Sequence, residues 1–293
     1  MLEGFGPFTY TTETNPRIGI HGVRGGAGPP LLLLHGFPQS HRIWDRVASQ
    51  LANEFFIVAI DLRGYGASSK PSGVQHYAKS AMARDVVRVM ATFGHTSYFI
   101  CAHDRGARVA HKLCVNYPDR VRKAIFLDIC PTLAMYTKTD LVFAKSYFHW
   151  FFLIQESPLP ETLISADPRK FLELFVGRRT ELTTFQADAW EDYVKVLEDP
   201  AAVHAMCEDY RASATVDLDE ARKDIEKGRK IMCPLRVLWG KTGVIEKCFD
   251  ALAEWRSVCE GEVSGYAVDC NHYIPEERPD VVVDNIKEFF LSQ

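Results

Sequence analysis

The stretch CAHDRGAR, residues 101–108, joins a short apolar run to a segment with helical periodicity. Residues 98–102 have the length and composition of a buried strand, and apolar positions in residues 109–117 recur at helical spacing before Pro118. A strand that turns directly into a helix around a reactive side chain is typical of a nucleophile elbow. The stretch therefore predicts a sheet with helices packed on it, and it places Asp104 at the end of one strand.

The same alternation continues on both sides of this stretch. Further short apolar runs predict strands at residues 31–34, 55–60, 123–129, 234–240 and 265–268. Helical spacing predicts helices at residues 77–93, 248–258 and 279–291. Elements that alternate in this way indicate an α/β fold with a mostly parallel central sheet flanked by helices, and ligand sites at the carboxyl ends of the strands. The residues before the first of these strands are expected to form a short, irregular N-terminal region.

The alternation stops between residues 131 and 230. This part of the chain has helix-like segments rich in aromatic, leucine and acidic residues, broken near Pro158, Pro168 and Pro200. A chain of 293 residues is long for one small domain, so a single core with an inserted subdomain suits its length. We therefore expect a core domain of residues 1–130 and 231–293 and a helical cap of residues 131–230.

Composition narrows the class of protein. Apolar residues make up 47% of the chain and charged residues 25%, as in ordinary globular proteins. The net charge of -4 and the scattered Lys and Arg residues argue against a nucleic-acid partner. No apolar run approaches the roughly 18 residues that span a bilayer, and no signal peptide is recognised, so a soluble, cytoplasmic protein without a membrane partner is expected. The eight cysteines form no CxxC pair, which predicts free thiols and no metal site.

Asp104 is the expected nucleophile. It stands at the elbow position, and the helix N-terminus that follows favours an ionised carboxylate. The small residues Ala102 and Gly106 relieve crowding at such a turn. A carboxylate can displace a leaving group from an sp3 carbon, and water can then hydrolyse the resulting ester. The alternative is that Asp104 is a helix N-cap, for which Asp is a favoured residue.

A histidine and a second acid complete the expected catalytic set. His272 lies after the last expected strand and before the last helix, where the order nucleophile, acid, histidine places the general base. Asp128 ends an apolar strand, and a charge at that point needs a buried partner, so we predict that it orients His272. Glu246 is the alternative acid, and a structural salt bridge is the alternative role for Asp128.

The oxyanion hole is expected from two backbone amides. HGFP, residues 35–38, follows the first core strand, and an amide in this turn can point at an ester carbonyl on Asp104. We predict that the amides of Phe37 and Arg105 form the hole, whereas a simple turn is the alternative reading of HGFP. His35 and His103 flank turns and are expected to act as supports.

Four motifs together resemble the α/β-hydrolase branch that contains haloalkane dehalogenases, epoxide hydrolases and haloacetate dehalogenases. They are HGFPQ at 35–39, DLRGYGAS at 61–68, HDRGARV at 103–109 and NHYIPEE at 271–277. The resemblance spans nearly the whole chain and is most specific to the fluoroacetate (haloacetate) dehalogenases. The features that carry it are Arg105, Arg108, YFHW at 147–150 and CEDYRA at 207–212. It implies the α/β-hydrolase fold with an inserted α-helical cap.

The resemblance also assigns substrate-binding residues. It implies that Arg105 and Arg108 bind a substrate carboxylate, for which guanidinium groups are suited, with phosphate binding or surface ion pairing as the alternative. It implies that His149, Trp150 and Tyr210 form a halide pocket, although the run at 147–152 would otherwise read as helix core. The implied reaction is hydrolytic dehalogenation of a small 2-haloacid, haloacetate or fluoroacetate giving glycolate and halide. It needs no metal or organic cofactor, and members of the family tend to be homodimers.

Two other functions remain open at this stage. An epoxide hydrolase would use the same Asp–His–Asp set, but resemblance to that group leads us to expect Trp after the nucleophile and two tyrosines in the cap. Arg105 and Trp150 argue against it. A non-catalytic homologue that only binds a ligand is the third possibility, and the retention of every expected catalytic group argues against it.

Overall fold

The computed structural model describes residues 4–13 and 16–292. Residues 1–3, 14–15 and 293, which we assigned to the core domain, lie outside the described residues. The strands form one sheet in the order β1-β2-β4-β3-β5-β6-β7-β8. Their bounds are β1 Phe5–Thr11, β2 Gly19–Gly25, β3 Pro30–Leu34, β4 Phe56–Ile60, β5 Tyr98–His103, β6 Val121–Leu127, β7 Leu235–Gly240 and β8 Val263–Val268. All neighbours from β4 to β8 are parallel, which confirms the mostly parallel sheet.

The N-terminal region differs from the expectation. Instead of an irregular segment, β1 and β2 form an antiparallel pair, and β2 pairs antiparallel with β4. The sequence of β1, FGPFTYT, contains two glycine or proline breakers and buries little, so its local signal is weak. Backbone pairing with the edge of the sheet stabilises these strands, and sequence periodicity does not record such pairing.

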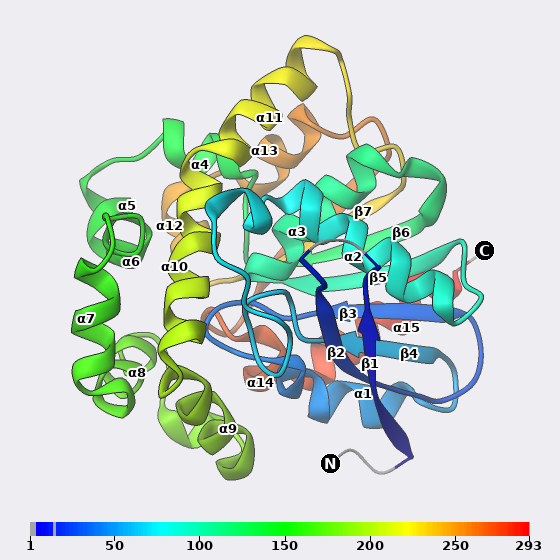
Figure 1. Ribbon diagram of the computed structural model, residues 1–293. Coiled ribbons are helices and arrows are strands. Elements are labelled where there is room, and N and C mark those ends of the chain that lie inside the picture. Colours follow the sequence, from blue (N-terminus) through cyan, green and yellow to red (C-terminus); the bar gives the residue numbers. More distant parts are fainter. Residues whose placement is uncertain (1–3, 14–15, 293) are drawn as a thin grey trace.

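Helices cover both faces of the sheet (Figure 1). The core on one face includes side chains of α2 (Lys79–Thr92), α3 (Asp104–Asn116) and α13 (Ala251–Ser257). The core on the other face includes side chains of α1 (Asp45–Leu51) and α15 (Pro279–Leu291). The leucines of β3 alternate between the two cores, as side chains of a strand buried on both faces must.

Eight α-helices separate β6 from β7 in the chain. They are α4 Thr132–Thr137, α5 Leu141–Ser146, α6 Phe148–Phe152, α7 Leu159–Ala166, α8 Pro168–Gly177, α9 Ala187–Leu197, α10 Pro200–Ala214 and α11 Val216–Glu226. We keep the name cap for residues 131–230, which contain them. Helices α5 to α10 gather at one side of the sheet, on the left in Figure 1, and α10 packs against α7, α9 and α11.

The remaining elements are short. They are η1 His41–Trp44, η2 Val74–Tyr77, η3 Pro118–Arg120, η4 Leu182–Thr184, α12 Val244–Cys248 and α14 Ile274–Glu277. The helix expected at 248–258 is found as α13, which begins after Asp250 because the Asp250 side chain accepts a hydrogen bond from the amide of Ala253. The short helix α12 before it was not expected.

Two further expectations can be compared with the structure. All eight cysteines are free thiols. Within residues 4–13 and 16–292, every helix is too short or too polar to cross a bilayer.

Candidate active site

The two predicted acids are held in an unusual backbone conformation. Asp104 starts α3 directly after β5, with φ of 45°, and Asp128 follows β6 with φ of 51°. Residues other than glycine rarely adopt this left-handed region, and such strain is concentrated at functional sites. Two glycines allow the close packing there. A Cβ on Gly36 would lie 2.4 Å from Cβ of Asp104, and one on Gly106 would lie 2.4 Å from the carbonyl oxygen of His35.

The structure brings the three predicted catalytic side chains together. Nδ1 of His272 lies 2.6 Å from Oδ2 of Asp128, and Nε2 of His272 lies 4.0 Å from Oδ2 of Asp104. The amide of Gly240 donates to the other oxygen of Asp128 at 2.8 Å. The carboxylate at Nδ1 holds the proton there, so Nε2 is unprotonated on the side that faces Asp104 and can accept a proton from water. The alternative acid, Glu246, instead accepts a hydrogen bond from Trp239 on an exposed part of the surface.

The two oxygens of Asp104 have different surroundings. The amide of Phe37 donates to Oδ1 at 3.0 Å, as expected for one half of the oxyanion hole. The amide of Arg105 lies in the first turn of α3, where amides have no acceptor within the helix. Oδ2 faces His272, so it is the oxygen available for attack if Asp104 is the nucleophile, as predicted.

His35 and His103 support this arrangement, as expected. Nδ1 of His35 donates to the carbonyl of Gly36, and Nε2 accepts from the amide of Leu62, both at 2.9 Å. His103 donates from Nε2 to the carbonyl of His272 at 2.8 Å. Burial lowers the pKa of His35 to about 4 and that of His103 to about 3, so both rings are neutral at pH 7.

Asp104 is ionised. Burial alone would raise the pKa of its carboxyl, but His272, His103 and Arg108 bring that pKa below its usual range. An ionised carboxylate with one oxygen unshielded is a competent nucleophile.

Arg105 is anchored more firmly than the sequence indicated. Its Nε donates to Oδ2 of Asp209 at 2.7 Å, and its Nη2 donates to the carbonyl of Asp209 and to Oγ of Ser213. Tyr65 and Lys79 also donate to Asp209. Asp209 and Ser213 therefore occupy Nε and Nη2 of Arg105. Nη1 of Arg105 alone is buried without a partner among the described residues.

The anchor itself gives a prediction. In Asp209→Asn, Arg105 loses its buried counter-charge and Lys79 keeps only Asp217, so we expect a lower Tm and a KM for an anionic substrate raised about tenfold, since charge-assisted hydrogen bonds are the strong ones. Thermal unfolding and initial-rate kinetics measure both. The matched control is Asp219→Asn, because Asp219 pairs with Arg222 on the exposed surface and should contribute little. An unchanged KM in Asp209→Asn would contradict the anchoring role.

Arg108 is the second predicted substrate-binding arginine. Its Nη1 donates to the carbonyl of Cys130 and to Oγ1 of Thr132, and its guanidinium lies 4.6 Å from the ring centre of Trp150. Burial and the charge of Arg105 lower its pKa. It has no carboxylate partner within residues 4–13 and 16–292, and its Nε is buried without a hydrogen bond. A bound anion would relieve this unfavourable charge.

The three predicted halide ligands also meet. His149 and Trp150 come from α6 and Tyr210 from α10, and the ring of Tyr210 lies 5.7 Å from that of His149 and 6.3 Å from that of Trp150. The guanidinium of Arg105 lies 4.1 Å from the ring centre of Tyr210. Nε1 of Trp150 and the hydroxyl of Tyr210 are buried without partners among the described residues. Buried donors are normally satisfied, so these two are available to hydrogen-bond a ligand.

Sequence reasoning assigned no role to two cap residues at this site. The hydroxyl of Tyr147 lies 3.4 Å from Nδ1 of His272. Nη2 of Arg179 lies 3.2 Å from Nδ1 of His149. Tyr147 belongs to the YFHW motif, which could have drawn attention to it, whereas nothing local distinguishes Arg179 from the Arg178 beside it.

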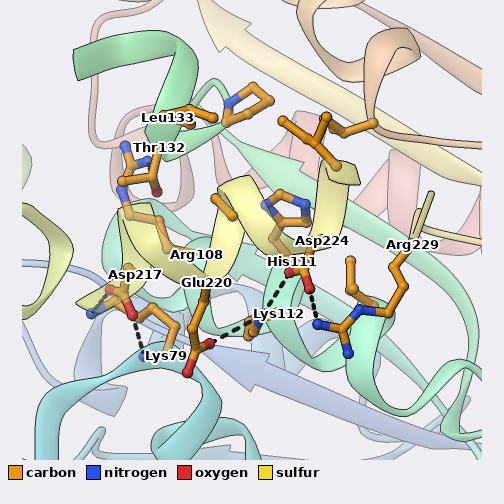
Figure 2. A pocket seen from close by; sticks show the side chains of 15 residues that line it. Lys79, Arg108, His111, Lys112, Thr132, Leu133, Asp217, Glu220, Asp224 and Arg229 are labelled. Atoms are coloured by element: carbon orange, nitrogen blue, oxygen red, sulfur yellow. Dashed lines mark hydrogen bonds and ion pairs between the residues drawn. The ribbon is translucent and has the colours of Figure 1, made fainter. Parts of the chain in front are cut away.

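A separate small cavity also borders Arg108 (Figure 2). Residues of α3, α4 and α11 line it, and ion pairs of Lys79 with Asp217 and of Lys112 with Glu220 lie at its edge. Neither Asp104 nor His272 lines this cavity, so it is distinct from the predicted reaction site.

Among the described residues, one group of side chains has the composition of a metal site, namely His21, His41 and Asp61. Both Nδ1 atoms contact the Asp61 carboxylate, at 3.1 Å for His21 and 2.8 Å for His41. Two backbone amides donate to the same carboxylate. Leu62, the next residue, donates to His35. These bonds satisfy the buried charge of Asp61 and support the loop of the oxyanion hole.

Known proteins that are similar to this chain are alpha/beta hydrolases or have their fold. A family description of the alpha/beta hydrolase fold matches residues 29–279. The chain is 39% identical to a fluoroacetate dehalogenase from Burkholderia sp, over 93% of this chain and 90% of that protein. It is 30% identical to a soluble epoxide hydrolase from Corynebacterium sp. (strain C12), over 92% of this chain and 93% of that protein. A crystal structure from Nostoc sp PCC 7120, assigned only to the alpha/beta hydrolases, matches with a TM-score of 0.95 and 44% identity over 100% of both chains.

Proposed function

The chain belongs to the alpha/beta hydrolase fold family, and from that premise we propose that it hydrolyses the carbon–halogen bond of small 2-haloacids. The products are the 2-hydroxyacid and a halide ion. For haloacetates, including fluoroacetate, the organic product is glycolate. The similarity to a fluoroacetate dehalogenase supports this substrate class.

The observation that carries the proposal is a set of buried donors without partners around an ionised carboxylate. Among the described residues these donors are Nη1 of Arg105, Nε of Arg108, Nε1 of Trp150 and the hydroxyl of Tyr210. Unpartnered buried donors are costly and are explained by a ligand that accepts hydrogen bonds. A 2-haloacid has two such acceptors, its carboxylate and its leaving halide. An anion-binding site next to a nucleophilic carboxylate therefore suits a haloacid.

In the first step, Oδ2 of Asp104 attacks the carbon that bears the halogen. A bond forms between this oxygen and the carbon, and the carbon–halogen bond breaks as the halide leaves with its electron pair. Arg105 and Arg108 hold the substrate carboxylate so that attack is in line. The donors of His149, Trp150 and Tyr210 stabilise the charge that develops on the halogen.

In the second step, water hydrolyses the ester. Nε2 of His272 removes a proton from the water, and the resulting hydroxide attacks the carbonyl carbon of the ester. Asp128 stabilises the protonated His272, and the amides of Phe37 and Arg105 bind the developing oxyanion on Oδ1. When this intermediate collapses, the bond between Cγ of Asp104 and Oδ2 breaks, and the 2-hydroxyacid leaves with Oδ2 as an alkoxide that takes the proton from His272. Asp104 loses its new carboxyl proton to solvent and returns to the carboxylate.

Epoxide hydrolysis is the second candidate function. The chain is 30% identical to a soluble epoxide hydrolase, and two cap tyrosines, Tyr147 and Tyr210, have buried hydroxyls close to the catalytic set. Such hydroxyls could protonate an opening epoxide ring. Arg105 after the nucleophile argues for an anionic substrate instead, since a neutral epoxide would leave Nη1 of Arg105 and Nε of Arg108 without an anionic acceptor.

The test is halide release. We expect the purified protein to release fluoride from fluoroacetate and chloride from chloroacetate, each followed with an ion-selective electrode, with glycolate formed in equal amount. A neutral epoxide such as styrene oxide, followed by diol formation, is the parallel assay. Chloride without fluoride would restrict the proposal to weaker carbon–halogen bonds. Diol without halide would replace it by epoxide hydrolysis, and binding of chloroacetate without turnover would favour a ligand-binding protein.

A further inference from the structure

Arg179 lies beside the proposed halide pocket but has no part in the reaction described above. It follows α8 in the cap and is partly buried, with its guanidinium 4.8 Å from the ring centre of Tyr147 and 4.7 Å from that of Phe175. Its carbonyl accepts a hydrogen bond from Nδ2 of Asn271 at 2.7 Å. Since Asn271 precedes His272, this bond ties Arg179 to the loop that carries the catalytic histidine.

The contact with His149 decides how that imidazole is protonated. Nη2 of Arg179 lies 3.2 Å from Nδ1 of His149. A guanidinium group has donors only, so Nδ1 must accept this hydrogen bond. A neutral imidazole that accepts at Nδ1 carries its proton on Nε2. Nε2 of His149 has no hydrogen-bond partner within the part of the chain that the structure describes, and it is therefore free to donate to a ligand.

We propose that Arg179 is a positioning residue that keeps His149 neutral with its proton on Nε2, directed at the leaving halide, and that it supplies the positive charge that balances this halide. The inference rests on the proposed dehalogenation and names the group that prepares its halide pocket. Burial and the nearby Arg179 both lower the pKa of His149 well below its usual value, in agreement with a neutral ring.

The charges around the site support this role. Arg105 is paired with Asp209, whereas Arg108 and Arg179 have no carboxylate partner among the described residues. Before the reaction the site holds two anions, Asp104 and the substrate carboxylate. After halide departure Asp104 is a neutral ester, and the two anions are the substrate carboxylate and the halide. Two unpaired guanidinium groups therefore match two anions at both stages, with Arg108 near the carboxylate and Arg179 near the halide.

The alternative is that Arg179 only packs against aromatic rings. Arg178 provides a matched control, because it is the adjacent arginine and lies 4.9 Å from the ring centre of Phe148, but it is exposed and donates to the carbonyl of Lys145 rather than to His149. Arg178→Met and Arg179→Met remove the same charge and keep a similar apolar stem. Arg179→Lys retains a cation and donors and serves as the conservative variant.

The first experiment reads the tautomer without any substrate. Protein labelled with ¹⁵N-histidine is compared with a His149→Gln variant to assign the ring signals of His149. We expect protonated Nε2 and unprotonated Nδ1 in the wild type and in Arg178→Met. In Arg179→Met we expect a mixture of tautomers and a higher pKa of His149. A wild-type ring protonated at Nδ1, or an unchanged ring in Arg179→Met, would overturn the proposal.

The second experiment measures bromide affinity against pH through tryptophan fluorescence. We expect Arg179→Met to bind bromide about tenfold more weakly than wild type near pH 8, since one charge-assisted interaction is lost. The deficit relative to wild type should shrink as the pH falls, because His149 without Arg179 then gains a proton and becomes a cation. Arg178→Met should follow the wild type, and Arg179→Lys should lie between. The other titratable or charged groups near His149 are His272, Arg105, Arg178, Tyr147 and Tyr210.

The outcomes separate this inference from the proposed reaction. Halide binding and the tautomer of His149 are measured on protein that turns nothing over. If neither haloacetate releases halide while the tautomer and bromide affinity respond to Arg179 as expected, the proposed function fails and the role of Arg179 stands. Equal bromide affinity in wild type, Arg179→Met and Arg178→Met would remove the role of Arg179 even if dehalogenation is observed.

Discussion

Asp104→Asn is expected to lower kcat for haloacetate hydrolysis by at least about 10⁴-fold, because a neutral amide is a poor nucleophile. The substitution keeps the shape of the side chain, and asparagine tolerates the left-handed backbone conformation found at this position. The amide of Phe37 can still donate to the remaining carbonyl oxygen. We therefore expect a folded protein that does not displace the halide. Halide release under saturating chloroacetate measures this loss.

Two controls accompany this variant. Its Tm should stay close to that of the wild type, and it should still bind bromide, because the donors of Trp150 and Tyr210 are untouched. Progress curves of halide release should be flat from the first minutes. Slow deamidation of the introduced asparagine to aspartate would instead give a lag followed by rising activity. Turnover within about tenfold of wild type without such a lag would show that Asp104 is not the nucleophile.

His272→Gln is expected to stop the reaction halfway. In the proposed mechanism His272 acts only in hydrolysis of the ester, where its Nε2 faces Asp104 and its Nδ1 is held at 2.6 Å by Asp128. The variant should therefore release about one halide per protein molecule in a rapid burst and then stall, with steady-state turnover at least about 10³-fold below wild type. Stopped-time assays of fluoride or chloride measure the burst.

Mass spectrometry of the stalled protein should find the ester on the peptide that contains Asp104. The control is the double variant Asp104→Asn with His272→Gln, which should give neither burst nor adduct. Continued turnover in His272→Gln would mean that another base activates the water. Absence of the burst, in protein of normal Tm, would mean that His272 is also required before the halide leaves, and the two-step assignment would then be wrong.

The arrangement of the three predicted catalytic residues was predictable because each of them is placed by the strand that precedes it in the chain. Asp104 follows a buried strand and begins a helix, Asp128 ends the next strand, and His272 lies in the loop after the last one. In a parallel sheet the carboxyl ends of the strands lie at the same edge. The strand order therefore brings these residues together, independently of the conformation of the loops. The resemblance then added a prediction that local sequence patterns cannot give, namely that residues of α6 and α10 lie close together above the sheet.

Other features were missed for physical reasons. The pairing of β1 and β2 depends on an exposed sheet edge rather than on apolar periodicity. The anchoring of Arg105 by Asp209 joins residues 104 positions apart, and the contact of Arg179 with His149 joins residues 30 positions apart. Neither pair has a spacing that a helix or strand repeats. Long polar side chains can also reach many partners, so their sequence context does not select one.

The sequence alone thus determined the strand-to-helix turn at Asp104, the placement of Asp104, Asp128 and His272 after strands, and the mostly parallel sheet. Strand and helix periodicity and chain order are properties of neighbouring residues. Only the tertiary structure decided which donors remain free for a ligand. Asp209 accepts hydrogen bonds from the guanidinium of Arg105, whereas Arg108 lacks a counter-ion among the described residues. Arg179 determines the tautomer of His149. Hydrogen bonding and charge pairing between distant segments depend on where the cap packs against the sheet, and that position results from the whole core.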